Sequence, residues 1–128
     1  MSGSVRKPLE GCRVLVVEDE PLLLLSIADV LLRAGAEVVG HAVTVIAAIH
    51  MARSVQFDCA VMDVKLHDKD VFPAAQLISA LGKGIVFVTG QPDYTALKSW
   101  PNAQVLAKPA TEDTVVKAVS TACARSPR

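Results

Sequence analysis

Four apolar runs in this sequence end in polar side chains that could do chemistry together. Glu18 and Asp19 follow the first run, and Asp63 closes the second. Thr89 closes the third, and Lys108 follows the fourth. If these runs are parallel strands lying side by side, their carboxyl ends meet at one edge of the sheet. Three carboxylates, one hydroxyl and one ammonium gathered there suit a divalent cation and a phosphoryl group.

The three carboxylates predict a metal site. Carboxylates held close together repel each other and raise one another's pKa unless a cation neutralises them. Mg²⁺ fits because it takes few protein carboxylates and keeps water and phosphate oxygens as its other ligands. Asp63 would then attack phosphorus and form an acyl phosphate, while Lys108 and the Thr89 hydroxyl hold the remaining phosphoryl oxygens. Each feature alone is common at strand ends, so the prediction depends on the order and spacing of all of them.

Short apolar runs alternate with longer helical patterns along the chain. Strands are predicted near residues 12–18, 37–41, 58–63, 84–89 and 104–107, and helices near 21–34, 44–55, 73–82, 93–99 and 112–124. This alternation indicates a parallel sheet covered on both faces. We therefore predict an α/β, doubly wound, five-stranded parallel sheet with strand order 2-1-3-4-5 and five helices. Gly35 is predicted to close the first helix, and Thr44 and Thr111 to cap the second and fifth.

Length and composition predict one domain with a large core. The chain has 128 residues, 52% of them hydrophobic, and no formal net charge. Residues 1–10 are polar and are predicted to form a flexible lead-in to a domain over residues 11–125. No bulk basic field favours nucleic acid or acidic membranes. No apolar run is long enough for a signal peptide or a membrane span, so a cytoplasmic location is expected.

The cysteines give no sign of a disulfide framework or a zinc site. Cys12, Cys59 and Cys123 are odd in number and far apart, and no Cys-x-x-Cys motif is present. Buried free thiols in a reducing cytoplasm are therefore predicted.

The motifs around the polar strand ends, taken together, resemble those of the receiver domain of bacterial two-component response regulators. The resemblance runs from about residue 12 to residue 124 and rests on Val-Leu-Val-Val-Glu18-Asp19-Glu20, Val-Met-Asp63, Val-Thr89-Gly90 and Ala-Lys108-Pro109. It implies a flavodoxin-like (CheY-like) fold. It also implies Mg²⁺-dependent phosphorylation of one aspartate by a phosphohistidine donor.

The resemblance assigns a role to each acidic residue. Asp63 would be the phosphoacceptor and Asp19 a direct metal ligand. Glu18 would act through a metal-bound water, and the backbone carbonyl of Lys65 would be the third protein ligand.

The resemblance also makes Thr89 the switch hydroxyl and Lys108 the phosphate-pairing lysine. Receivers commonly carry an aromatic residue three positions before the lysine, and its ring moves with the switch threonine. Val105 occupies that position here. A valine cannot signal by a large ring rotation, so we consider instead that the segment from residue 90 to residue 101 carries the change.

The loop after the acceptor departs from the usual receiver pattern. It lacks the Met-Pro and the Asp-Gly or Asn-Gly pairs that receivers often have there. Together with residues 84–90 it resembles a subgroup of small, often single-domain receivers with a Phe-Ala-Thr-Gly signature, in which Val88 replaces the alanine. His67 in this loop either touches the phosphoryl group or metal, or is a solvated loop residue. Lys65 and Gln91 are expected to flank the mouth of the site.

The first predicted helix contains more apolar residues than one buried stripe needs. Its outer leucines either bind a partner helix or are simply exposed. The resemblance implies that this helix docks a sensor histidine kinase or a histidine phosphotransfer protein, the expected donors.

We therefore predict a signalling module, not an enzyme, that acts in a phosphorelay through protein contact or as a phosphate sink, without direct nucleic-acid binding or membrane insertion. Two alternatives stay open, namely a receiver excised from a larger regulator and an interaction domain that works without phosphorylation. An aspartyl-phosphate phosphohydrolase would need an aspartate where Lys65 stands. A flavin module would need a phosphate loop without the acidic pair at Glu18 and Asp19.

Overall fold

The computed structural model describes residues 6–125. Its elements, in chain order, are β1 (Arg13–Val17), α1 (Pro21–Arg33), β2 (Glu37–Ala42), α2 (Val45–Ser54), β3 (Cys59–Asp63), β4 (Lys65–Leu66), β5 (Lys69–Asp70), α3 (Phe72–Ala80), β6 (Gly84–Thr89), η1 (Thr95–Ser99), β7 (Gln104–Ala107) and α4 (Glu112–Arg125). Five parallel strands form one sheet in the order β2-β1-β3-β6-β7, and β4 and β5 form a separate antiparallel pair. The predicted order 2-1-3-4-5 is confirmed.

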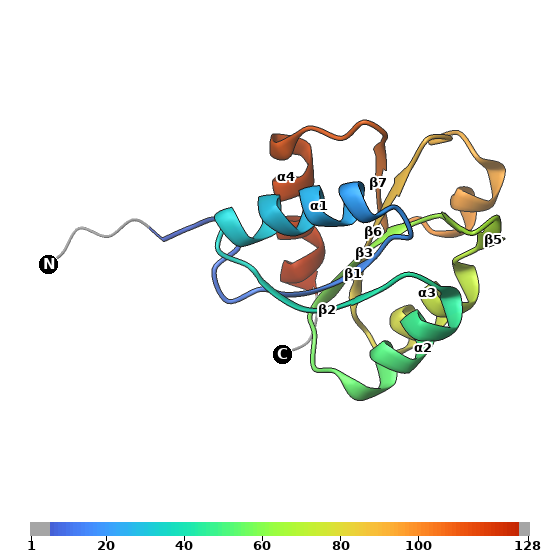
Figure 1. The fold of residues 1–128 in the computed structure, drawn as a ribbon, viewed down its shortest axis with the longest axis horizontal. Coiled ribbons are helices and arrows are strands. Elements are labelled where there is room, and N and C mark those ends of the chain that lie inside the picture. The colour runs from blue at the N-terminus through green and yellow to red at the C-terminus, as the bar shows by residue number, and fades with distance from the viewer. Residues whose placement is uncertain (1–5, 126–128) are drawn as a thin grey trace, which may run out of the picture.

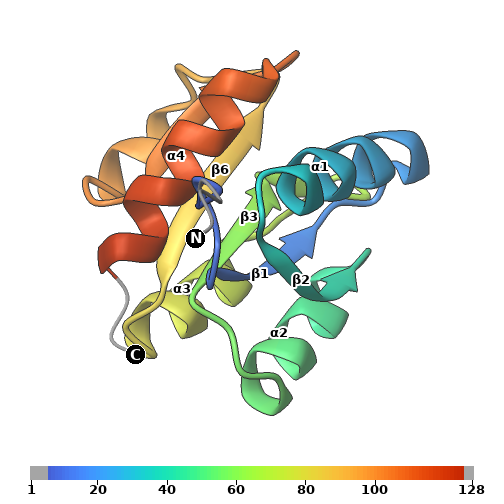
Figure 2. The same cartoon turned by 90° about the vertical axis from the view of Figure 1, so that its left-hand side faces the viewer.

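The sheet is the middle of three layers. Helices α1 and α4 cover one face and α2 and α3 cover the other (Figures 1 and 2). Successive residues of β1 point to opposite faces, so Val14 and Val16 join the core under α1 and α4 while Leu15 and Val17 join the core above α2 and α3. Burial on both faces explains why the central strands are apolar throughout and do not alternate.

Local signals set the helix ends as predicted. The Thr44 hydroxyl accepts a hydrogen bond from the Ala47 N–H at 3.0 Å and caps α2. The Thr111 hydroxyl accepts one from the Thr114 N–H at 3.2 Å at the start of α4. Gly35 follows α1 with φ +99°, a left-handed conformation that glycine adopts without strain.

The fourth of the five predicted helices is present, but it is not an α-helix. The segment forms the five-residue 3-10 helix η1, and the described chain has four α-helices. Pro92 and Pro101 bracket it. Proline lacks the N–H that continues a helical hydrogen-bond ladder, so the space between them holds only a short turn of helix.

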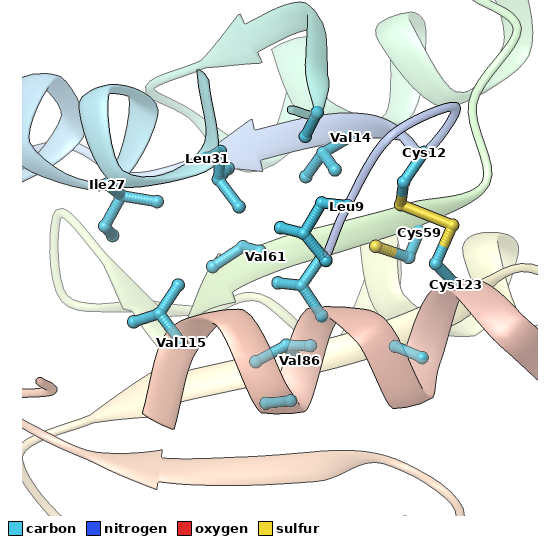
Figure 3. Close-up of a cluster of buried hydrophobic side chains, with 14 of the residues drawn as sticks. Leu9, Cys12, Val14, Ile27, Leu31, Cys59, Val61, Val86, Val115 and Cys123 are labelled. Carbon is cyan, nitrogen blue, oxygen red and sulfur yellow. A yellow bond between two sulfur atoms is a disulfide. The ribbon is translucent and has the colours of Figure 1, made fainter. Parts of the chain in front are cut away.

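The prediction of three free thiols is also wrong. Cys12 and Cys123 form a disulfide with their Cα atoms 6.2 Å apart, and Cys59 is the free, buried cysteine (Figure 3). The partners are 111 residues apart in sequence but meet because the start of β1 lies beside the last turns of α4. The Cα separation lies within the range that a disulfide spans.

The described part of the predicted lead-in is packed against the domain. Leu9 is buried, and its N–H donates to the Ala34 carbonyl at 2.9 Å. Residues 1–5 lie outside the described part of the chain, and the domain boundary at residue 11 stays a prediction. Among residues 6–125, no helix has the length and apolar character needed to cross a membrane.

Candidate functional site

Three carboxylates lie together at the carboxyl edge of the sheet. Glu18 and Asp19 follow β1, and Asp63 ends the neighbouring strand β3. One carboxylate oxygen from each lies within 4.8 Å of the others. The register of the two strands produces this cluster: Val17 pairs with Met62, so Glu18, which follows Val17, and Asp63, which follows Met62, come at the same level of the sheet.

Lys108 reaches the cluster from the loop after β7. Its Nζ lies 2.8 Å from Asp63 Oδ2 and 3.4 Å from Glu18 Oε1. Burial by itself would lower the pKa of Lys108, but the hydrogen bond and charge of Asp63 and the charge of Glu18 raise it. The lysine therefore stays protonated and offsets one of the three carboxylate charges.

Thr89 borders the cluster on β6. The sheet register pairs Asp63 with Val88, so Thr89 is one position further along the adjacent strand. Its side chain is buried, its hydroxyl accepts the Gln91 N–H at 2.9 Å, and its carbonyl accepts the Lys108 N–H at 2.8 Å. Backbone contacts thus fix the predicted switch hydroxyl and lysine to each other.

Glu18 is the most perturbed acid of the site. It is only 1% exposed, and this burial, together with the nearby charge of Asp63, raises its pKa to about 7. The Glu20 N–H, which donates to Oε2 at 3.2 Å, and the Lys108 charge only partly oppose the shift. Its Oε1 accepts no hydrogen bond, although the Lys108 ammonium lies 3.4 Å away.

Asp19 behaves in the opposite way. Burial would raise its pKa, but the His67 N–H donates to Asp19 Oδ2 at 2.9 Å, and the net effect lowers the pKa. Asp19 is thus held as a carboxylate, oriented by a backbone donor.

These residues fit a hard divalent cation. When ionised, the three carboxylates exceed the Lys108 ammonium by two negative charges, and a buried Glu18 oxygen lacks a hydrogen-bond donor. Carboxylate oxygens are the ligands that Mg²⁺ takes in proteins. A bound cation would relieve the desolvation and repulsion that keep Glu18 protonated near neutral pH.

A small hairpin after Asp63 positions the backbone N–H that donates to Asp19. The sequence analysis did not predict this hairpin. Strands β4 and β5 pair Lys65 with Asp70, and the turn residues His67 and Asp68 have φ 48° and 64°. The turn aims the His67 N–H at Asp19, while the His67 side chain is 62% exposed, with its Nδ1 3.6 Å from Asp19 Oδ2. The left-handed turn contains no glycine, the residue whose presence would have predicted such a turn from the sequence.

Lys65 is linked to Asp63 through its backbone N–H, which donates to Asp63 Oδ1 at 3.3 Å. The predicted role of its carbonyl as a metal ligand stays a prediction. Its ammonium pairs with Asp70 at 3.0 Å, and the Tyr94 hydroxyl donates to the same carboxylate at 3.3 Å. The hairpin therefore connects Asp63 to the segment before η1.

An aromatic cluster continues from Tyr94. The Phe72 ring stacks on Tyr94 and on Trp100, with ring centroids 6.3 Å and 5.8 Å apart, and Phe87 packs edge-on against Phe72 and Trp100. The four rings are spread through the sequence, and no motif predicted that they would meet.

Val105, at the position where receivers commonly carry an aromatic residue, is 38% exposed on β7.

Comparisons with known proteins agree with this arrangement. The family model described as the response regulator receiver domain matches residues 14–120. No curated protein matches the chain. Three solved structures illustrate the likeness. The response regulator PhyR from Brucella abortus is 25% identical, with a TM-score of 0.78 and coverage of 88% of this chain and 47% of that one. A response regulator receiver protein from Sinorhizobium medicae is 26% identical, with a TM-score of 0.80 and coverage of 91% and 97%.

The third structure, the receiver domain of PhyR from Erythrobacter litoralis, shows the same fold, with a TM-score of 0.81 at 23% identity and coverage of 93% and 95%. The chain spans about half the length of the Brucella protein and nearly all of the isolated receiver. Since the family model matches most of the sequence and the strand order agrees, this chain belongs to the receiver domain family of response regulators.

Proposed function

We propose that this receiver accepts a phosphoryl group on Asp63 from the phosphohistidine of a sensor histidine kinase or a histidine phosphotransfer protein, with Mg²⁺ bound. The observation that carries the proposal is the 2.8 Å contact between Lys108 Nζ and Asp63 Oδ2 beside the acidic pair Glu18 and Asp19. A carboxylate with a fixed cation on one side and metal ligands on the other suits phosphoryl transfer.

The step is a displacement at phosphorus. An Asp63 carboxylate oxygen attacks, the P–N bond to the donor imidazole breaks, and the imidazole leaves with the bonding electrons. Bound Mg²⁺ would neutralise charge on the transferring oxygens. Asp19 and Glu18 would hold the cation, Lys108 would exchange its contact with Asp63 for a phosphoryl oxygen, and the Thr89 hydroxyl would turn toward the same group.

The donor is proposed to dock on the N-terminal half of α1. Leu22 and Leu25 are 83% and 65% exposed there, three and six residues after Asp19, while Ile27 and Leu31 fill the core. Their exposure supports a partner helix on this face. Leu25→Gln should slow transfer from a histidine phosphotransfer protein. Leu32→Gln, which changes a leucine that is 55% exposed near the other end of α1, should not. Equal rates for both variants would overturn the docking site.

Phosphorylation is tested by intact mass after incubation with Mg²⁺ and acetyl phosphate. The parent should gain the mass of one phosphoryl group, Asp63→Asn should gain none, and EDTA should prevent the gain. Asp68→Asn, which changes an exposed carboxylate in the same loop, is the matched control and should behave as the parent. No adduct with any donor would favour the alternative, an interaction domain that works without phosphorylation.

The signal is proposed to leave through protein contact, or the domain acts as a phosphate sink, in the cytoplasm. The formal net charge of zero gives no bulk field for nucleic acid or membrane surfaces. Transfer of label from the phosphorylated chain back to a histidine phosphotransfer protein would support a sink. A partner retained only by the phosphorylated form would support output by contact.

A further inference from the structure

The disulfide lies at the end of the sheet opposite the acidic cluster and takes no part in the proposed phosphoryl transfer. Cys12 immediately precedes β1, and Cys123 lies in the last turns of α4. We propose that this pair is a reversible redox site, which forms by exchange with a small-molecule or protein disulfide and locks α4 to the first strand.

Packing of the fold, and not the disulfide bond itself, brings the two sulfurs together. Leu9, Cys12, Cys59 and Cys123 belong to one buried cluster between α1, α4 and the sheet (Figure 3). The last turns of α4 also lie close against the start of β6. A Cβ added to Gly84 would fall 2.9 Å from the Cβ of Ala122, the neighbour of Cys123, which shows how tightly the two elements pack. Packing therefore sets the distance between the cysteines in the reduced protein as well, so oxidation needs no rearrangement of the backbone.

A reagent can reach this pair. Cys12 and Cys123 are 3% and 8% exposed, and both line a surface cavity of about 190 Å³ that Glu10 and Ser120 border. Cys59 is 0% exposed, and burial raises the pKa of its thiol to about 12. Because the attacking species in disulfide exchange is a thiolate, Cys59 stays inert and exchange must come through the cavity.

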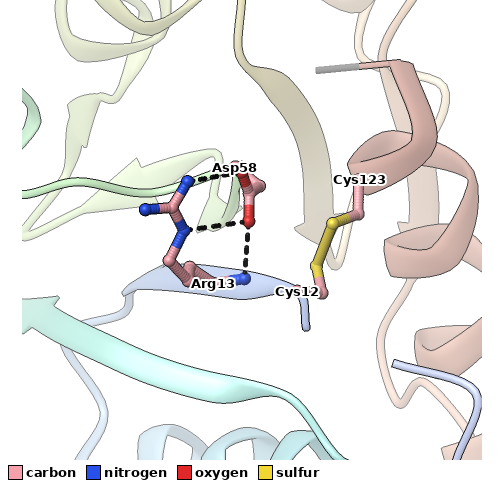
Figure 4. The surroundings of a disulfide bond; sticks show 4 residues. All are labelled: Cys12, Arg13, Asp58 and Cys123. Carbon is pink, nitrogen blue, oxygen red and sulfur yellow. Dashed lines mark hydrogen bonds and ion pairs between the residues drawn. A yellow bond between two sulfur atoms is a disulfide. The ribbon is translucent and has the colours of Figure 1, made fainter. Parts of the chain in front are cut away.

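The charges around the pair favour its oxidised form. Asp58 is fully buried with one carboxylate oxygen within 4.8 Å of both sulfurs, and it accepts hydrogen bonds from the N–H and guanidinium of Arg13 (Figure 4). Its negative charge opposes a thiolate at either sulfur. A disulfide is reduced easily when the thiolate product is stabilised, and the Asp58 carboxylate beside both sulfurs works against such stabilisation.

The disulfide forms in two exchange steps. One cysteine, as thiolate, attacks the oxidant's disulfide and releases one thiolate. The other cysteine then attacks the resulting mixed disulfide and releases the second thiolate, leaving one S–S bond in the protein. The two protons that the cysteines lose convert the two released thiolates into thiols. In a reducing compartment the pair would be a dithiol that closes under oxidative conditions.

The test equilibrates the full chain in a series of glutathione buffers, quenches it with acid, alkylates it under denaturing conditions and reads the mass. Three labels per chain are expected in the most reducing buffer and one, on Cys59, in the most oxidising, with the two others lost in a single step. Cys59→Ala should keep that step, and Cys123→Ser should abolish it. Parent chain unfolded in urea should need a more oxidising buffer, because packing no longer holds the cysteines together.

Three results would overturn the proposal. These are three labels in every buffer, a lasting single glutathione adduct in place of the paired loss, or pairing as favourable in the unfolded chain as in the folded one. The urea comparison uses the parent protein, so it stands even if Cys123→Ser fails to fold.

Discussion

Replacing Glu18 by glutamine should make the metal-free protein less sensitive to pH. The pKa of Glu18 is about 7 in the folded protein, where burial and Asp63 oppose its charge, and its ordinary value is 4.5. Between these values the folded chain keeps a proton that the unfolded chain has released. The free energy of unfolding therefore falls as pH rises through this window. The glutamine cannot ionise, so the variant lacks this loss.

The size of the effect follows from the shift. From 4.5 to about 7 is about 2.5 pKa units, and each unit is worth about 1.4 kcal/mol, so ionisation of Glu18 costs about 3 kcal/mol above neutral pH. The residue is 1% exposed, so solvent screens little of this cost. A cost of about 3 kcal/mol is about a fifth to three fifths of the free energy of unfolding of a domain this size, which is typically about 5–15 kcal/mol.

Urea unfolding in EDTA at about pH 5 and about pH 8 measures the effect. The difference in unfolding free energy between Glu18→Gln and the parent should move by about 2.5 kcal/mol in favour of the variant between the two pH values, because a small part of the loss already lies below about pH 5. Glu112→Gln, which changes a carboxylate 51% exposed in an ion pair with Arg33, is the control and should move by less than about 0.5 kcal/mol. Parallel pH curves for Glu18→Gln and the parent would refute the reasoning. Mg²⁺ added at about pH 8 should stabilise the parent but not the variant, by about 2.7 kcal/mol at a hundredfold excess over Kd.

Three further changes probe other parts of the fold. Arg13→Met should lower the free energy of unfolding by about 2–4 kcal/mol, because it removes the guanidinium that pairs with the fully buried Asp58 carboxylate. Arg33→Met, which changes an arginine in exposed ion pairs, should lower it by less than about 1 kcal/mol. Equal losses for the two variants in urea unfolding would contradict this. Gly84→Ala should cost about 1–3 kcal/mol because a Cβ overlaps α4, and an unchanged unfolding midpoint would show that α4 can shift. Fluorescence emission from Trp100, the only tryptophan, should change when a beryllofluoride phosphoryl mimic is added. Unchanged emission, together with unchanged NMR amide spectra for η1, would rule out a rearrangement of this segment.

Much of the fold could be predicted because its signals are local. Apolar runs marked the strands, and the helix ends followed from Gly35, Thr44 and Thr111. The carboxyl ends of parallel strands share one edge, so the meeting of Glu18 with Asp63 also followed from the strand order.

What could not be predicted depends on geometry that the sequence does not record. The Asp19 partner is the backbone N–H of His67, and a backbone donor leaves no mark in the residue types. The Cys12–Cys123 bond joins residues 111 positions apart, and their approach is set by how α4 packs on the sheet. An odd number of cysteines indicated free thiols, but one of the three is free and the other two are paired.

The contacts around Lys65 bear on how a receiver without the usual aromatic could signal. Val105 has no ring to move, and its side chain is partly exposed on β7. Asp63, however, accepts the Lys65 N–H, the Lys65 ammonium pairs with Asp70, and Asp70 accepts the Tyr94 hydroxyl. Tyr94 stacks on Phe72 at the start of the aromatic cluster. A phosphoryl group on Asp63 would compete for the Lys65 N–H. The first contacts to change would therefore lead through the hairpin to the segment around η1, the same segment that Val105, in place of the usual aromatic residue, already indicated.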